Sequence, residues 1–228
     1  MDGIIIVNKP SGITSYDVIR FFKRRYVIKS KIGHAGTLDP LASGVLIVCI
    51  GRATRMSSAF MALEKEYVAR MMLGTITDTD DIDGNVLEIR PVEVCEDDVR
   101  KAFTRFMGEI EQVPPVVSAI KYKGDPLYKL HRKGIDIVPK VRKVLIKEME
   151  ILRIEIPLVE FRVVCSKGTY IRALCRDIGN ILGCGGVQTK LERRRIGSFT
   201  INQSLTPGEI EKQGIEKSLI GLKGFEIK

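Results

Sequence analysis

The chain has 228 residues, a length that suits one large domain or a domain with a small appendage. Hydrophobic residues make up 44% and charged residues 29%, which excludes disorder as a description of the whole chain. Lys and Arg total 37 against 28 Asp and Glu, so the formal net charge is +9. This surplus favours a polyanionic partner, either nucleic acid or an anionic membrane surface.

Several protein classes are excluded by simple features of the sequence. No apolar run approaches the roughly 18 residues of a membrane span. The N-terminus contains Asp2 and Pro10 and lacks the basic region of a secretory signal. Five cysteines without a C-x-x-C pair, and only two histidines, disfavour a disulfide framework and a zinc site. We therefore expect a reduced, cytoplasmic protein without a metal.

The predicted elements alternate between strands and helices from the N-terminus onward. Residues 3–7 form a short apolar run that is typical of a strand. Thr14 and Asp17 have the spacing of a capping box, which predicts a helix through about Arg25. Residues 45–50 are apolar on both faces, and this pattern predicts a central strand of a sheet.

The second half of the chain continues this alternation. Residues 66–73 and 158–165 alternate as half-buried strands do. Apolar residues at helical spacing predict one helix around residues 99–106 and another over 171–182, which a glycine-rich stretch ends. Because hairpin-length and helix-length connections are mixed, we predict an α+β fold with a mixed, largely antiparallel sheet flanked by helices and loops.

Residues 33–46, with the sequence GHAGTLDPLASGVL, form the strongest candidate for a site. Three glycines and a proline precede the apolar strand, and a loop beside a rigid strand can position a side chain. Asp39 is the only carboxylate of this loop, and Pro40 biases it toward an extended conformation. An Asx-turn without a catalytic role is the alternative for Asp39.

Residues 165–179, CSKGTYIRALCRDIG, place a Lys-Gly turn before a predicted helix. The free backbone N–H groups at such a helix start can bind phosphate. Arg172 and Arg176 lie one helical turn apart, and Arg172 borders the apolar stripe. This arginine either extends to solvent at the helix edge or pairs with a buried acid.

Residues 63–84 combine Tyr67, in a predicted strand, with the acidic run TDTDDIDG. An aromatic side chain in a strand is most often part of the core. The alternating carboxylates of Asp78, Asp80 and Asp83 resemble calcium ligands, but the EF-hand spacing and its distal glutamate are absent. We therefore expect a solvated turn at the acidic run.

Two further segments are rich in basic residues. Residues 118–134 interleave Tyr122 and Tyr128 with lysines and an arginine, which suits a surface that follows a nucleic-acid backbone and stacks on bases. Residues 191–199 carry three consecutive arginines before a predicted strand. A solvated basic face is the alternative for both segments.

In combination, these segments resemble the bacterial tRNA pseudouridine synthase B (TruB) family, whose wider group includes the eukaryotic and archaeal dyskerin-type enzymes. Residues 33–46 are similar to the family signature. The other segments occur in family order and cover about residues 3–205: NKPSGITS at 8–15, EY at 66–67, TDTDDIDG at 77–84, PPVVSAIKYKGDPLY at 114–128, SKGTYIR at 166–172 and the 191–199 segment.

The resemblance implies the pseudouridine synthase fold for residues 1–205 and roles for individual side chains. Asp39 corresponds to the catalytic aspartate, Tyr67 to the active-site tyrosine and Arg172 to the arginine that pairs with the aspartate. The further matches concern the substrate pocket: Tyr170 beneath the uracil, Leu191 as an apolar wall, His34 in the space left by flipped nucleotides, Asp81 as an acid near the site, and Lys9 as a structural lysine of the N-terminal motif.

The implied function is isomerisation of a specific uridine in the T loop of tRNA (U55) to pseudouridine. The glycosidic bond is cleaved and the uracil is rejoined through C5, which requires neither a cofactor nor a metal. Asp39 either attacks C1′ or removes a proton from C2′, and Arg172 would hold its carboxylate ionised. Tyr67 is a candidate to assist proton loss from C5. The base must be extruded from the folded T loop before it can react.

Family members usually continue into a small RNA-binding domain of the PUA type. Residues 206–228 provide only a short C-terminal tail, with no room for that domain. We therefore expect weaker tRNA affinity, with a smaller salt dependence, than in a full-length relative. We also expect a cytoplasmic monomer that binds the tRNA T stem-loop without a membrane or an obligate protein partner.

Three alternative functions are open at this point. An RNA-binding, tRNA-folding chaperone with little turnover is the first, although a binder has no need of Asp39, Tyr67 and Arg172 together. An aspartate-dependent hydrolase is disfavoured because it normally uses a second carboxylate or a metal. A related synthase that modifies another RNA or works in a guide-RNA complex is the third, and the bacterial-style motifs and the lack of basic tails disfavour a guide complex.

Overall fold

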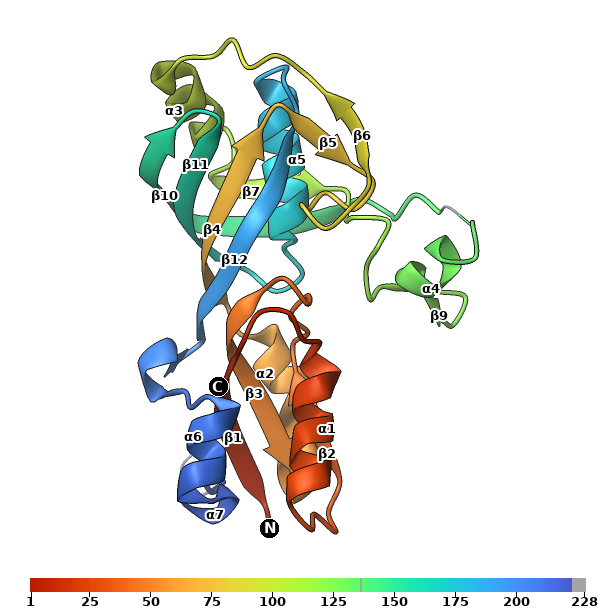
Figure 1. Cartoon of the computed structure of the whole chain (residues 1–228), viewed down its shortest axis with the longest axis vertical. Coiled ribbons are helices and arrows are strands. Elements are labelled where there is room, and N and C mark those ends of the chain that lie inside the picture. The colour runs from red at the N-terminus through yellow and green to blue at the C-terminus, as the bar shows by residue number, and fades with distance from the viewer. Residues whose placement is uncertain (136, 223–228) are drawn as a thin grey trace. The chain divides into compact units, whose positions relative to one another are not determined.

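The computed structural model describes residues 1–135 and 137–222 of the chain (Figure 1). It contains two compact units, which are called unit 1 (Met1–Tyr67 and Leu191–Lys228) and unit 2 (Val68–Lys190). Both boundaries fall inside long strands, β4 (Lys65–Leu73) and β12 (Gly186–Ile196). These two strands therefore contribute residues to both units.

Unit 1 is built from the two ends of the chain. Besides its parts of β4 and β12, its elements are β1 (Gly3–Lys9), α1 (Ser15–Arg25), β2 (Ile32–Ala35), β3 (Ser43–Ile50), the 3-10 helix η1 (Gly51–Met56), α2 (Ser57–Ala62), β13 (Phe199–Thr200), the 3-10 helix η2 (Ile201–Gln203), α6 (Pro207–Gln213) and α7 (Ile215–Ser218). Strand β3 pairs antiparallel with β1 and β2 and parallel with β12.

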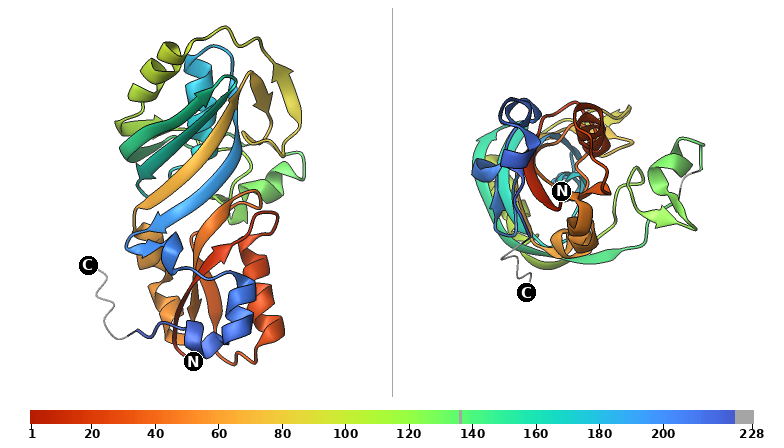
Figure 2. Two further views of the ribbon diagram at one scale, coloured as in Figure 1. Left: turned by 60° about the vertical axis from the view of Figure 1, so that its left-hand side comes forward. Right: turned by 90° about the horizontal axis from the view of Figure 1, so that it is seen from below.

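The strands β1 and β3 are covered on both faces. One face packs against α1, α6 and α7 through residues that include Phe22 and Ile210 (Figure 2). The other face packs against η1, α2 and β13, where the rings of Phe60 and Phe199 meet edge to face at 5.7 Å. The prediction that residues 45–50 form a central strand is therefore confirmed.

Helix α1 begins and ends where the sequence predicts. The Thr14 hydroxyl accepts a hydrogen bond from the Asp17 amide at 3.0 Å, and the Asp17 carboxylate accepts one from the Thr14 amide at 2.9 Å. These two bonds form the predicted capping box. The last turn carries three basic residues, which interact favourably with the negative end of the helix dipole.

The described part of the predicted C-terminal tail packs on unit 1. Residues 206–222 contain α6 and α7, and Thr206 caps α6 with a second capping box. Ile220 then exchanges two backbone hydrogen bonds of 2.9 Å with Ile4 of β1. Because Ile210 is completely buried, this segment contributes to the core of unit 1.

Unit 2 is a sheet with helices and small strand pairs around it. Besides its parts of β4 and β12, its elements are β5 (Thr75–Thr77), β6 (Val86–Ile89), α3 (Glu96–Thr104), β7 (Gly108–Gln112), β8 (Lys121–Tyr122), β9 (Asp125–Pro126), α4 (Leu127–His131), β10 (Arg142–Glu155), β11 (Leu158–Cys165) and α5 (Ile171–Ile181). The strand order is β12-β4-β11-β10-β7, and β10 pairs antiparallel with β11 and β7.

Helix α5 covers one face of this sheet (Figure 1). The approach is close because Gly179 has no side chain: a Cβ atom there would lie 2.2 Å from the backbone of Gly185. The apolar stripe that predicted this helix is buried, with Leu174 and Ile178 completely enclosed. The α+β class with a mixed, largely antiparallel sheet is thus confirmed.

Two details differ from the sequence predictions. The helix expected around residues 99–106 ends at Thr104, so Phe106 packs in the core from beyond its C-terminus. The arginines of residues 191–199 do not precede a strand but lie within β12, because this strand pairs with β3. Among the residues that the structure describes, no helix is long and apolar enough to cross a bilayer.

Candidate active site

Asp39 lies in the loop between β2 and β3 and is half-buried. The amide of Ala42 donates to the Asp39 carbonyl at 3.1 Å, which closes a turn with Pro40 in its second position. Leu38 and Ala42, on either side of this turn, are buried. Residues 38–42 are called the Asp39 turn below. Its backbone is therefore fixed at both ends.

The N-terminal segment NKPSGITS fastens the Asp39 turn to unit 1. The buried Ser15 hydroxyl donates to the Leu38 carbonyl at 3.0 Å and accepts from the Leu38 amide at 2.8 Å. The Gly12 amide donates to the Pro40 carbonyl at 2.8 Å. Residues 8–15 and 33–46, two of the segments that carry the family resemblance, are thus hydrogen-bonded to each other around Asp39.

Lys9 belongs to the same structure and is completely buried. Its ammonium donates to the carbonyls of Ile13 at 2.7 Å, Pro10 at 2.8 Å and Pro40 at 3.4 Å. Burial lowers the pKa of Lys9 to about 8, while the negative charge of Asp39 acts in the opposite direction. These contacts support the structural role that the resemblance implies, since Lys9 ties the N-terminal loop to the Asp39 turn.

Three further predicted residues lie on strands of unit 1. His34 lies in β2, and burial together with the positive charge of Arg193 lowers the pKa of its imidazole, which is therefore neutral at pH 7. The Nδ1 atom of His34 is buried and has no hydrogen-bond partner among the described residues. Tyr67 in β4 and Leu191 in β12 are 8% and 7% exposed.

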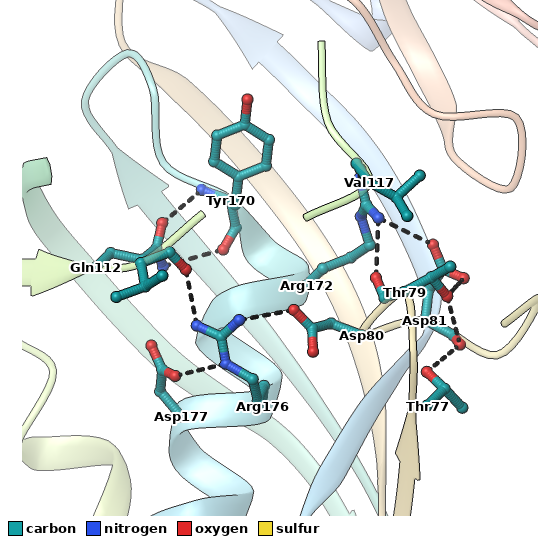
Figure 3. Close-up of polar contacts among 11 residues, drawn as sticks. Thr77, Thr79, Asp80, Asp81, Gln112, Val117, Tyr170, Arg172, Arg176 and Asp177 are labelled. Atoms are coloured by element: carbon teal, nitrogen blue, oxygen red, sulfur yellow. Dashed lines mark hydrogen bonds and ion pairs between the residues drawn. The ribbon is translucent and has the colours of Figure 1, made fainter. Parts of the chain in front are cut away.

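Arg172 lies in the first turn of α5 in unit 2 and is 4% exposed (Figure 3). Its guanidinium donates to the carbonyls of Thr79 at 2.9 Å and Val117 at 3.0 Å and lies 3.5 Å from the Asp81 carboxylate. Asp81 in turn accepts a hydrogen bond from the Thr79 hydroxyl at 2.8 Å. Of the two alternatives for Arg172, pairing with a buried acid is therefore confirmed.

The acidic run forms a turn, as the sequence predicts, and Asp83 is exposed, but the run is not solvated throughout. Asp81 is only 8% exposed, and Asp80 lies 2.7 Å from the guanidinium of Arg176, one turn along α5 from Arg172 (Figure 3). Burial raises the pKa of Asp80, and the nearby arginines oppose this effect. The expectation of a solvated turn was wrong for Asp80 and Asp81 because helix spacing presents two arginines to them. Among described residues, no group of carboxylates, histidines and cysteines could hold a metal ion.

Tyr170 precedes α5, and its backbone is held by a residue that the sequence did not single out. Gln112 of β7 is 1% exposed, donates to the Tyr170 carbonyl at 3.1 Å and accepts from the Tyr170 amide at 2.8 Å. In Figure 3 the Tyr170 ring points away from the helix. A lone glutamine at the end of a strand gives no sequence signal for this role.

Residues 118–134 form the strand pair β8 and β9 and the short helix α4. Tyr122 is 42% exposed, with the Lys123 ammonium 5.6 Å from its ring centroid. The Arg132 guanidinium lies 5.8 Å from the ring of Tyr128. The segment thus presents cation and aromatic groups together, as the sequence suggests for a surface that contacts nucleic acid.

The predicted site residues fall into two sets. Unit 1 holds Lys9, His34, Asp39, Tyr67 and Leu191, and unit 2 holds the remaining ones: Asp81, Tyr170 and Arg172. Within unit 1 the structure brings Lys9 to the Asp39 turn, and within unit 2 it pairs Arg172 with Asp81. The pairing of Arg172 with Asp39 stays a prediction.

Comparison with protein families identifies relatives of this chain. Residues 23–171 match the family model described as TruB family pseudouridylate synthase, N-terminal domain. The chain is 48% identical over 221 residues to tRNA pseudouridine synthase B of Clostridium kluyveri, covering 96% of this chain and 76% of the relative. It is 46% identical over 206 residues to the enzyme of the same name from Burkholderia pseudomallei, covering 90% and 68%.

Solved structures give a consistent result. A chain from a Cbf5-Nop10-Gar1 complex superposes with a TM-score of 0.72 at 34% identity, covering 92% of this chain and 54% of that one. A chain from an H/ACA RNP bound to a substrate RNA containing 2′-deoxyuridine gives a TM-score of 0.69 at 32% identity, covering 92% and 52%. The present chain thus spans about half the length of these solved chains.

Proposed function

Because the chain belongs to the TruB family of pseudouridylate synthases, we propose that it isomerises the uridine at position 55, in the T loop of tRNA, to pseudouridine. Relatives that are 48% and 47% identical to this chain are named tRNA pseudouridine synthase B. The observation that carries the proposal is the Asp39 turn, which lies inside the matched region and is fastened by Ser15 and Lys9. Such a turn is suited to present one carboxylate in a fixed position.

The proposed reaction is an isomerisation in which bonds and protons balance within the substrate. The C1′–N1 bond breaks, the C1′–C5 bond forms, C5 loses a proton and N1 gains one. Asp39 starts the reaction either by attacking C1′ or by removing a proton from C2′. Both routes use the ionised carboxylate, and no oxidant, reductant or outside group enters.

The other site residues would bind the extruded base and its surroundings. Tyr67 would stack on the base or assist proton loss from C5, and Tyr170 would lie beneath the uracil. Leu191 would form an apolar wall of the pocket. Extrusion of the nucleotide removes its stacking and costs a few kcal/mol. His34, whose imidazole is neutral at pH 7, would replace part of that stacking.

We further propose that Arg172 supports the ionised state of Asp39 and that the ion pair with Asp81 fixes the Arg172 guanidinium.

Basic residues of 118–134 would supply sequence-independent affinity for the RNA backbone. We also propose a cytoplasmic location, because that is where a tRNA substrate would be met. We expect a monomer without a protein partner, which size-exclusion chromatography with light scattering would test.

The test is tritium release from a tRNA transcript labelled at C5 of uridine. The matched control is a transcript in which cytidine replaces the uridine at position 55. We expect the protein to release about one label per molecule of the uridine-55 transcript. We expect no protein-dependent release from the cytidine-55 transcript. Release that is equal from both transcripts would contradict the assignment of the T-loop position. Binding of tRNA with no release would favour the chaperone function.

A further inference from the structure

A completely enclosed arginine lies next to the Asp39 turn in unit 1. Arg193 of β12 is 2% exposed and stands opposite Gly44 in the parallel pairing of β12 with β3. Burying a guanidinium removes its hydration, which is costly unless hydrogen bonds replace it. An apolar side chain of similar volume would fill the same space at lower cost, so the charge and the donors of Arg193 need an explanation.

The guanidinium of Arg193 binds the backbone on both sides of the Asp39 turn. Its Nε atom donates to the Val45 carbonyl at 2.8 Å, and its Nη2 atom donates to the Gly36 carbonyl at 2.9 Å. Gly36 precedes Asp39 by three residues, and Val45 follows it by six. Because a guanidinium is planar and rigid, these two bonds fix the separation between the entry and the exit of the loop.

The backbone around Arg193 is shaped for this contact. Gly36 has φ +88°, and a Cβ atom there would lie 3.6 Å from Nη1 of Arg193. Gly44 has φ +101°, and a Cβ atom there would lie 2.3 Å from the Arg193 carbonyl oxygen. Gly44 therefore allows the loop to approach the Arg193 backbone closely, whereas a Cβ atom at Gly36 would make only ordinary contact and glycine is favoured there by its positive φ.

The charge of Arg193 also reaches the neighbours of the Asp39 turn. Burial is the main cause that lowers the pKa values of Lys9 and His34, and the positive charge of Arg193 lowers both further, so these three basic groups lie within electrostatic range of one another. The negative charges of Asp39 and Asp17 both act to raise the pKa of Lys9, so the Asp39 carboxylate also lies within electrostatic range of this lysine. Lys9 and Ser15 hold the Asp39 turn itself, and Arg193 of β12 holds the loop on either side of that turn.

We propose that Arg193 is a positioning residue for Asp39: by joining the Gly36 and Val45 carbonyls, it sets the path of the loop and the place of the carboxylate. This inference rests on the proposed function, in which Asp39 is the reacting group. Arg193 acts through the loop backbone, so a loss of its geometry lowers the rate of the chemical step and leaves tRNA binding intact.

The test compares Arg193→Lys with Arg194→Lys in single-turnover tritium release. Arg194 is the adjacent residue on β12, but it is exposed and pairs with Glu192 at 2.8 Å. Lysine keeps the charge at position 193 but lacks the planar pair of donors. We expect the plateau rate at saturating enzyme to fall about 10- to 100-fold in Arg193→Lys and to change less than about twofold in Arg194→Lys.

The design separates positioning from a merely structural role. Partial unfolding reduces the concentration of competent enzyme and raises the amount needed for half-saturation, but it leaves the plateau rate unchanged. A plateau rate in Arg193→Lys equal to that of the wild type would therefore overturn the inference. Arg193→Gln, which keeps hydrogen-bond donors without the charge, provides a second variant for which we expect the same loss of plateau rate.

Failure of this inference is distinguishable from failure of the proposed function. Wild-type turnover that Asp39→Asn abolishes, combined with full plateau rates in both Arg193 variants, overturns only the role of Arg193. If Asp39→Asn turns over at the rate of the wild type, the assigned role of Asp39 is overturned. The role of Arg193 as a residue that positions Asp39 then fails with it.

Discussion

The hydroxyl of Ser15 exchanges two hydrogen bonds with the backbone of Leu38, donating to its carbonyl at 3.0 Å and accepting from its amide at 2.8 Å. Ser15 is the first residue of α1, and Leu38 is the residue before Asp39. All three groups involved are buried or nearly so. The start of a helix thereby determines where the Asp39 turn begins.

Substitution Ser15→Ala removes both bonds and leaves the amide and the carbonyl of Leu38 buried without this partner. Each unsatisfied group costs about 1–3 kcal/mol, so we expect the free energy of unfolding to fall by at least 1 kcal/mol. Urea denaturation measures this change. The matched control is Ser11→Ala, whose exposed hydroxyl donates to the Leu41 carbonyl at 2.7 Å. Equal effects of the two substitutions would contradict the role of Ser15.

Substitution Arg176→Met should destabilise unit 2 by breaking its contact with Asp80. The two side chains are only 24% and 13% exposed, and Arg176 also donates to the Val113 carbonyl at 2.8 Å. Because the Asp80 carboxylate would remain buried without its partner, we expect a loss of about 2–3 kcal/mol in unfolding free energy.

The control for Arg176 is an ion pair on the surface. Arg100→Met breaks the contact with Glu96, in which both side chains are more than half exposed, and should cost less than about 0.5 kcal/mol. A double-mutant cycle with Asp80→Asn would isolate the coupling between Arg176 and Asp80. A coupling energy near zero would show that Arg176 does not stabilise the buried Asp80 carboxylate.

The pKa of Lys9 predicts a distinct dependence of stability on pH. Burial lowers it from the ordinary 10.5 to about 8 in the folded chain. Between these pH values the unfolded chain holds a proton that the folded chain has lost, so stability attributable to Lys9 rises with pH. The slope approaches about 1.4 kcal/mol per pH unit, and below pH 8 both states are protonated and this contribution is constant.

The measurement compares wild type with Lys9→Met by urea denaturation at pH 7, 8, 9 and 10. Other groups titrate in the same range, but they are common to both proteins, so only the difference between the curves reports Lys9. We expect the difference to change in favour of the wild type above about pH 8. Parallel curves would show that burial does not alter the titration of this lysine.

Substitution Gly44→Ala tests the close approach between β3 and β12. The added Cβ atom would lie 2.3 Å from the Arg193 carbonyl oxygen, at a φ of +101° that side chains rarely adopt. We expect a loss of more than about 2 kcal/mol in unfolding free energy, from strain and from displacement of β12. Gly33→Ala is the control, since its Cβ atom would meet nothing within 4 Å. Similar melting temperatures of the two variants would contradict the close approach of β3 to β12 at Gly44.

Local patterns predicted the elements around Asp39 correctly. The capping box at Thr14 and Asp17 gave the start of α1, and the apolar run 45–50 gave the centre of β3. Both signals lie within a few residues of the feature they specify. The Asp39 loop was recognisable for the same reason, because its glycines and its proline restrict the backbone locally.

The burial of Arg193 was not predictable from its neighbourhood in sequence. Three consecutive arginines are typical of a solvated face, but alternation along β12 places Arg193 inside and leaves Arg194 exposed. The partners of Arg193 lie about 150 residues away, at Gly36 and Val45, and only the parallel pairing with β3 brings them together. Long-range register of this kind leaves no local signal.

The acidic run shows the same limit in unit 2. Its composition alone indicates a solvated turn, yet Asp80 and Asp81 are enclosed because Arg176 and Arg172 reach them from α5. The one-turn spacing of the two arginines was visible in the sequence. Their acidic partners were not, since they precede α5 by about 90 residues.

The central claim is that Asp39 carries out the isomerisation of the T-loop uridine. The most direct measurement is tritium release from C5-labelled tRNA by wild type and Asp39→Asn, with tRNA affinity measured in the same buffer. We predict release by the wild type, no detectable release by Asp39→Asn, and affinities that agree within a few-fold, because asparagine preserves shape but removes the reacting charge. Release by Asp39→Asn at a rate comparable to that of the wild type would contradict the account.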